Sequence, residues 1–203
     1  MSARAGSLSV VGEVPAIWTI GHSNHPFDRF AELLGGQGVE FVVDVRSYPY
    51  SRIAPQFNRE ELDVALDRLG VRYLFLGEEL GGRPSREEEY DEQGHARYDR
   101  MAERPVFRDA IERLLRGSRE RRLALLCSGG QPQECHRRLL VGRVLTEHGV
   151  QLRHILPNGV IQQEDFVSLD SDDAQENLFG EEAAWRSTRS VSRRRRLSTS
   201  SAA

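Results

Sequence analysis

The sequence predicts a single α/β domain with a Rossmann-like, three-layer architecture and a five-stranded, mostly parallel sheet. Short apolar strands alternate with amphipathic helices five times along the chain, which is typical of a parallel sheet covered by helices on both faces. The 203 residues are enough for one such domain with a full core. We place the domain at residues 16–157, between a flexible leader (1–15) and a disordered tail (158–203) that is first acidic and then basic.

The first half of the chain predicts three strands and two helices. The apolar runs at residues 16–20 (AIWTI), 41–45 (FVVDV) and 71–76 (VRYLFL) predict the strands. A helix is expected at 26–35, where it begins with proline and ends at a Gly-Gly pair. A second helix is expected at 58–69, because an asparagine suits its N-cap and a glycine follows its end.

The second half predicts two more strand–helix steps after a long polar segment. Residues 77–104 predict a glycine-rich loop, and a loop of that length in a compact domain is typical of a functional lid. A helix follows at 105–116 and a buried strand at 123–126. The last helix is expected at 132–148, with proline in its first turn, and the last strand at 150–156.

The strand order is predicted from the apolarity of each strand. The first, second and fourth strands are continuously apolar, whereas the third and fifth contain polar residues, as edge strands often do. This ranking favours the order 3-2-1-4-5 over the alternative 2-1-3-4-5.

Composition excludes several classes of function. The chain has no apolar run of membrane-spanning length and no signal-peptide pattern, so we expect a cytoplasmic protein without a membrane partner. Its two cysteines are expected as thiols in a reducing compartment. The net charge of −3 argues against broad coating of nucleic acid, although the charges are unevenly placed and every basic residue is arginine.

The stretch at residues 123–138 (LALLCSGGQPQECHRR) concentrates the reactive side chains. It predicts a buried strand, a sharp polar loop and the start of a helix. Arg137 shares one helix face with the core residues Leu140, Val141 and Val144. A cation on a buried face needs an anion, and that anion is either an internal carboxylate or a ligand.

Polar and reactive residues follow several predicted strands. Because parallel sheets bind ligands at the carboxyl ends of their strands, we expect these residues to meet at one edge. Arginines outnumber the single buried acid there, so an anionic ligand containing a phosphate or a nucleotide is favoured. The candidate catalytic residues are Cys127, Cys135, His22 and His136, and the candidate substrate-binding residues are Ser23, Asp44, Arg46, Ser51, Gly82, Arg83 and Arg137.

Five short motifs resemble one known family. TIGHS (19–23), DVR (44–46), the step from Pro49 to Ser51, LGG (80–82) and CHR (135–137) are together similar to the family called domain of unknown function 488. The resemblance covers roughly residues 17–156 and implies a small bacterial or archaeal α/β domain without an established reaction. The family commonly has an acidic residue where this chain has Gly129. If that acid takes part in the chemistry, Glu134 or Asp44 would have to replace it.

Each reactive residue has a structural interpretation beside the functional one. Cys127 is either a thiolate nucleophile or a small buried residue that ends a strand. Cys135 is more readily passive than catalytic, and a disulfide between the two requires Cα atoms within about 7 Å. The spacing of His22, His25, Cys135 and His136 matches no standard zinc template, so we expect no metal there. The sequence names no cofactor.

The charged residues also leave alternatives open. Asp44 either pairs with Arg46 or Arg137 to hold strand ends together, or it orients an arginine toward a ligand. Glu134, three residues before Arg137, could instead neutralise that arginine locally.

The tail carries one more motif. Residues 175–179 (QENLF) look like the Q-x-x-L-F peptide by which bacterial repair and replication proteins dock on the DNA sliding clamp, with Gln175, Leu178 and Phe179 as the contact residues. The leading hypothesis is therefore an enzyme that acts on a phosphate- or nucleotide-containing substrate and is linked to DNA repair. The alternative is a non-catalytic module that binds a nucleotide or nucleic acid and docks on the clamp. A third hypothesis is a thiol redox sensor.

Overall fold

The structure, a computed structural model, describes residues 14–164 and 185–191. The predicted leader and the clamp-docking residues Gln175, Leu178 and Phe179 lie outside the described residues, so the docking motif stays a prediction. None of the helices within these two ranges has the length and apolar character that crossing a bilayer requires.

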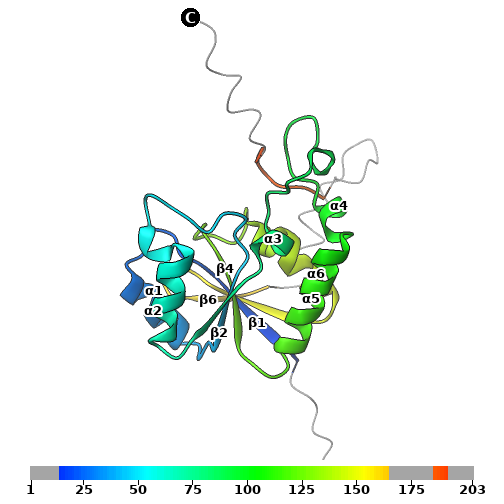
Figure 1. The fold of residues 1–203 in the computed structure, drawn as a ribbon. Helices are drawn as coiled ribbons and strands as arrows, with labels where there is room; N and C mark the ends of the chain where they lie inside the picture. Colours follow the sequence, from blue (N-terminus) through cyan, green and yellow to red (C-terminus); the bar gives the residue numbers. More distant parts are fainter. Residues whose placement is uncertain (1–13, 165–184, 192–203) are drawn as a thin grey trace, which may run out of the picture.

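A six-stranded sheet separates two layers of helices (Figure 1), and the predicted α/β class with a mostly parallel sheet is confirmed. The strands are β1 (Ala16–Gly21), β2 (Phe41–Asp44), β3 (Arg72–Phe75), β4 (Leu123–Cys127), β5 (Gln151–Ile155) and β6 (Ile161–Gln163). One face carries α1 (Phe27–Gly35), the 3₁₀ turn η1 (Pro55–Phe57) and α2 (Arg59–Asp67), and the other carries α3 (Gly77–Leu80), α4 (Tyr98–Ala102), α5 (Pro105–Gly117), the π-helical segment η3 (Arg137–Gly142) and α6 (Arg143–Glu147).

Alternation along the strands creates two separate cores. In β1, Ile17 packs on the α5 and α6 side, whereas Trp18 and Ile20 pack on the α1 and α2 side, as the two-residue period of a strand requires. Phe30 and Leu34 of α1 fill the second core, and both are buried because they lie on one face of that helix.

The strand order is β3-β2-β4-β1-β5-β6, so the predicted order 3-2-1-4-5 is wrong. β4 lies between β1 and β2 and pairs with both in parallel. Apolarity could not rank these three strands because each is buried along almost its whole length. The consequence for the site is large, since Cys127 at the end of β4 lies between the residues that follow β1 and β2.

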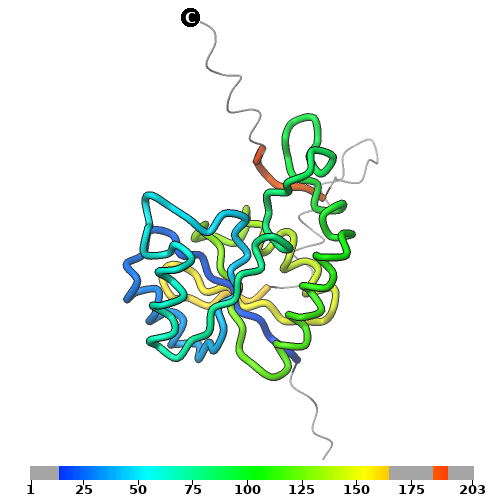
Figure 2. The backbone as a smooth tube through the Cα atoms, viewed as in Figure 1, coloured from blue at the N-terminus to red at the C-terminus, as the bar shows by residue number. Residues whose placement is uncertain are grey.

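The described domain continues beyond residue 157, where the sequence prediction ended it. β6 pairs with β5 in the antiparallel direction and adds the sixth strand. Residues 185–191 run beside residues 94–98, as Figure 2 shows, with backbone hydrogen bonds from Tyr98 to Trp185 and from Ser187 to Ala96. Trp185 anchors this segment, because its indole N–H donates to the Leu139 carbonyl at 2.6 Å and its ring packs edge-on against Tyr98.

Residues 77–104 are more regular than the predicted loop. They contain α3, the 3₁₀ turn η2 (Glu87–Glu89) and α4, and Tyr90 and Ala96 form an antiparallel bridge. Leu80, Tyr98 and Met101 anchor the segment in the core, a pattern that its polar composition hides.

Gly21 at the end of β1 permits the close approach of the loop after β4. A Cβ at this position would lie 1.7 Å from the Gly129 carbonyl oxygen. We expect Gly21→Ala to lower the free energy of unfolding by about 1–3 kcal/mol through overpacking, as measured by urea denaturation. Gly35→Ala is the matched control, because a Cβ there meets nothing within 4 Å. Equal stability of the two variants would show that the approach is not tight.

Candidate functional site

A cavity of about 950 Å³ opens at the carboxyl ends of β1, β2 and β4. The chain leaves β1 toward α1 on one face of the sheet and leaves β4 toward η3 and α6 on the other face. Doubly wound proteins bind ligands at such a point, between neighbouring strands whose connections go to opposite faces. Eight of the predicted site residues line it: His22, Arg46, Ser51, Gly82, Arg83, Cys127, Cys135 and His136. Ser23, Asp44 and Arg137 lie outside the lining. They hydrogen-bond to residues that line the cavity or that belong to the loop after β4.

Three side chains meet at the cavity wall and form what we call the sulfur–imidazole cluster: Cys127, Cys135 and His136. The Nδ1 atom of His136 lies 3.7 Å from the Cys127 sulfur and 3.9 Å from the Cys135 sulfur. Both cysteines are free thiols and are nearly buried. The cluster forms because β4 ends at Cys127 while the turn that leads into η3 carries the other two residues.

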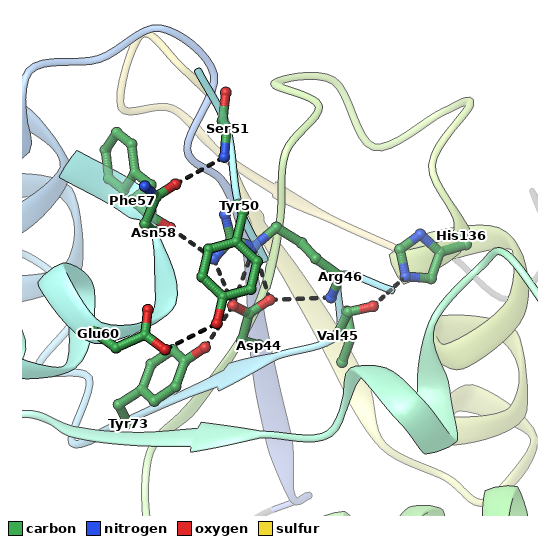
Figure 3. Close-up of polar contacts among 10 residues, drawn as sticks. All are labelled: Asp44, Val45, Arg46, Tyr50, Ser51, Phe57, Asn58, Glu60, Tyr73 and His136. Carbon is green, nitrogen blue, oxygen red and sulfur yellow. Dashed lines mark hydrogen bonds and ion pairs between the residues drawn. The ribbon is translucent and has the colours of Figure 1, made fainter. Parts of the chain in front are cut away.

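The ring of His136 is fixed from two sides. Its Nε2 atom lies 2.8 Å from the Val45 carbonyl oxygen (Figure 3), and a carbonyl only accepts, so Nε2 carries the proton and donates. The unprotonated Nδ1 of the neutral ring therefore faces the two sulfurs. Gly82 makes this packing possible, because a Cβ there would lie 2.5 Å from Cγ of His136.

The pKa values of the two cysteines shift in opposite directions, because the Cys127 thiolate accepts a hydrogen bond from the Cys135 thiol. The Cys135 thiol, as hydrogen-bond donor, lowers the pKa of Cys127 well below its usual value, and His136 and Arg137 lower it further despite burial. The same interaction raises the pKa of Cys135. Burial is the largest single influence on His136 and lowers its pKa, but the Cys127 thiolate and the hydrogen bond to the Val45 carbonyl together outweigh burial, so the histidine pKa is raised. A thiolate is the form of cysteine that attacks electrophiles and binds metals.

Asp44 and Arg46 form a buried ion pair at the end of β2 (Figure 3). The Arg46 NH2 group lies 2.6 Å from Oδ2 of Asp44, and Nε lies 2.9 Å from Oδ1. The hydroxyl of Tyr73 also donates to Asp44, at 2.7 Å, and Arg46 donates to the Phe57 carbonyl at 2.8 Å. Of the alternatives open for Asp44, the pair with Arg46 is therefore formed.

Arg137 is fully buried, as its helix position predicts, but its partners are neither of the two that were expected. Its guanidinium donates to the carbonyls of Gly129 and Gly130, the latter at 2.8 Å, and to the Thr19 hydroxyl at 3.4 Å. Arg137 thus holds the loop after β4 in place. Glu134 does not neutralise it in the described structure, because Glu134 pairs with Arg189.

Arg83 and Arg189 are the exposed arginines of the cavity lining in the described residues, and Arg189 pairs with Glu134. The backbone N–H of Arg83 donates to the Ser47 hydroxyl at 2.9 Å, which fixes the chain and leaves the side chain in solvent. No carboxylate among the described residues lies within ion-pair distance of its guanidinium. Arg83 is therefore available to an anion, whereas Arg46 already has Asp44.

His22 is buried in the lining with one unused nitrogen. Its Nδ1–H donates to the Ser23 carbonyl at 2.8 Å, and its ring stacks on Phe57 with centroids 4.7 Å apart. Nε2 is buried and has no hydrogen-bond partner in the described structure. Burial lowers the pKa of His22, so the ring is neutral at pH 7 and Nε2 can accept a proton. Ser23 supports it from a left-handed turn with φ of +49°.

Ser51 and the tyrosines beside it shape the outer part of the cavity. The Ser51 hydroxyl accepts from the backbone N–H groups of Ile53 and Ala54, so it stabilises the turn. Tyr48 and Tyr50 line the cavity and are 64% and 41% exposed, with ring centroids 5.3 Å apart. This aromatic pair was not predicted from the sequence, although two tyrosines around a proline after a buried strand could have indicated it.

The comparison with known families decides where this chain belongs. The family model described as "Domain of unknown function DUF488" matches residues 26–144, more than half of the chain. The chain belongs to the DUF488 family. The resemblance inferred from the motifs is thereby confirmed, and the matched DUF488 region contains DVR, LGG and CHR, whereas TIGHS precedes it. No curated protein and no solved structure matches the chain significantly.

Four further residues of the lining could not be predicted as site residues from the sequence. Ser187, Thr188, Arg189 and Val191 come from the 185–191 segment, which reads as part of a polar tail. Only Trp185, an isolated aromatic residue in that tail, could have indicated that the segment returns to the domain.

Proposed function

We propose that this DUF488 protein is an enzyme that acts on a phosphate-bearing substrate of the nucleotide class. The observation that supports it most is the sulfur–imidazole cluster, whose three side chains all line a cavity open to solvent. A buried thiol pair with only a packing role needs neither an oriented imidazole nor access to a cavity. The cluster is the reaction centre in this proposal.

Recognition of the phosphate is assigned to Arg83. It is the exposed arginine of the lining that has no carboxylate partner in the described ranges, and a guanidinium binds phosphate through paired N–H donors. Arg46 also lines the cavity, but its charge is balanced by Asp44.

Recognition of a base is assigned to Tyr48 and Tyr50. Both rings are partly exposed at the cavity, and a planar base stacks favourably on such rings. The cavity volume of about 950 Å³ is within the range of small-molecule sites. His22 would serve as a general base, because the lone pair of its buried Nε2 has no partner in the described structure.

A binding experiment tests the assignment of Arg83. We expect Arg83→Ala to weaken binding of inorganic phosphate or a nucleoside monophosphate about tenfold or more, because a charged hydrogen bond is lost. Isothermal titration calorimetry with the full chain measures this. Arg86→Ala is the matched control, since Arg86 is exposed on the same segment but outside the lining. Equal affinity of the two variants would contradict the assignment.

A further inference from the structure

The sulfur–imidazole cluster brings together three good metal donors. The sulfurs of Cys127 and Cys135 and a ring nitrogen of His136 all lie within 4.8 Å of one another. The four residues weighed from the sequence form a different set, because His22 and His25 are not part of the group that the described structure brings together.

The donor separations are those of a tetrahedral site. Zinc binds cysteine sulfur at about 2.3 Å and histidine nitrogen at about 2.0–2.1 Å, so regular tetrahedral angles place sulfur and nitrogen about 3.5–3.6 Å apart. The observed separations between His136 Nδ1 and the two sulfurs are 3.7 and 3.9 Å. The two nitrogen–sulfur separations thus exceed the tetrahedral values by only a few tenths of an ångström, and the two sulfurs lie within 4.8 Å of each other.

His136 is oriented in the manner of a metal ligand. A ligating histidine usually donates its second ring N–H to a carbonyl or carboxylate, which fixes the tautomer and directs the other nitrogen to the metal. The Nε2–H of His136 makes this hydrogen bond to the Val45 carbonyl at 2.8 Å. Gly82, which allows close packing against the ring, restricts it further.

The arrangement favours a metal ligand set over a simple nucleophile and base. A catalytic cysteine–histidine pair needs one sulfur beside the imidazole, whereas Nδ1 here is almost equidistant from two. Charge also fits, because two thiolates and one dication form a neutral unit, which a nearly buried site tolerates. Of the two buried arginines nearby, Arg46 is neutralised by Asp44, whereas Arg137 keeps its charge and favours the thiolate form of Cys127.

We propose that Cys127 Sγ, Cys135 Sγ and His136 Nδ1 bind one Zn²⁺ ion and that the fourth coordination position faces the cavity. Zinc sites with three protein ligands and an open position are typical of catalysis, whereas structural sites are closed by four. A catalytic role of the open position, which could take a water or a substrate oxygen, rests on the proposed function. Metal binding itself does not depend on that function.

Metal analysis of the purified full chain tests the proposal. After incubation with Zn²⁺ and desalting, we expect about one zinc per chain by plasma mass spectrometry, and with Co²⁺ the charge-transfer absorption of thiolate-bound cobalt. Cys127→Ser, Cys135→Ser and His136→Gln should each lose most of the bound metal. His148→Gln is the matched control, because His148 is exposed and lies just beyond the C-terminal end of α6, away from the cluster at the start of η3. Circular dichroism checks that each variant is folded.

Two results would overturn the proposal. One is a folded wild-type chain that retains neither zinc nor cobalt, and the other is retention of metal by both folded cysteine variants. To separate loss of folding from loss of ligands, metal binding is also measured on the wild-type chain after its thiols are alkylated. If zinc is bound but neither phosphate nor any nucleoside monophosphate binds, the metal site stands and the proposed enzyme function fails.

Discussion

Replacing Asp44 with asparagine should lower the free energy of unfolding by about 3–5 kcal/mol, because it leaves a buried arginine without its counter-charge. Asp44 is fully buried and Arg46 is 5% exposed, so water cannot screen the unpaired guanidinium. The loss is a large fraction of the 5–15 kcal/mol that typically separates folded and unfolded domains. Urea denaturation followed by circular dichroism measures it.

Two further variants separate the ion pair from other effects of the Asp44 substitution. The double variant Asp44→Asn with Arg46→Met should be more stable than Asp44→Asn alone, because it removes the uncompensated charge. Glu32→Gln is the matched control for an exposed ion pair, since Arg29 and Glu32 are 40% and 66% exposed, and it should change stability by less than about 1 kcal/mol. A loss of that small size for Asp44→Asn as well would contradict the account of this pair.

Arg137→Met should destabilise the fold by about 3 kcal/mol or more, because it leaves the carbonyls of Gly129 and Gly130 without their buried donor. The loop after β4 carries part of the cavity lining, so the variant should also weaken ligand and metal binding. Arg137→Lys should recover only part of the stability, because one ammonium group cannot reproduce the fork of a guanidinium.

The control for Arg137 is a surface arginine. Arg116 and its partner Glu112 are both 69% exposed, so Arg116→Met should leave the free energy of unfolding almost unchanged. Thermal and urea denaturation of all three variants give the comparison. Full stability of Arg137→Met would mean that the loop does not depend on the buried cation.

The burial of Arg137 could be predicted from the sequence, but its partners could not. Helical periodicity placed this residue on the core face, and it is 0% exposed. Backbone carbonyls accept its hydrogen bonds, and every residue has such a carbonyl, so no residue type marks the partner. The prediction that a carboxylate or a bound anion would be the partner of Arg137 was therefore wrong.

The proximity of Cys127 and His136 could be predicted in part from the α/β class of the fold. Carboxyl ends of parallel strands share one edge, so residues after β1, β2 and β4 were expected together. The central position of β4 could not be read from three equally buried strands, and it is this position that sets Val45 beside His136. The contribution of residues 185–191 was hidden because a few anchoring contacts, such as those of Trp185, outweigh a polar composition.

Alkylation of the two cysteines is the most direct test that the sulfur–imidazole cluster forms part of the functional site. The chain contains only these two, and both line the cavity, so complete reaction with iodoacetamide modifies this site and no other thiol. Binding of nucleoside monophosphates and inorganic phosphate is then measured by calorimetry before and after treatment, with circular dichroism confirming the fold. We predict binding by the untreated chain and its loss after alkylation. Unchanged binding after complete alkylation would contradict the account.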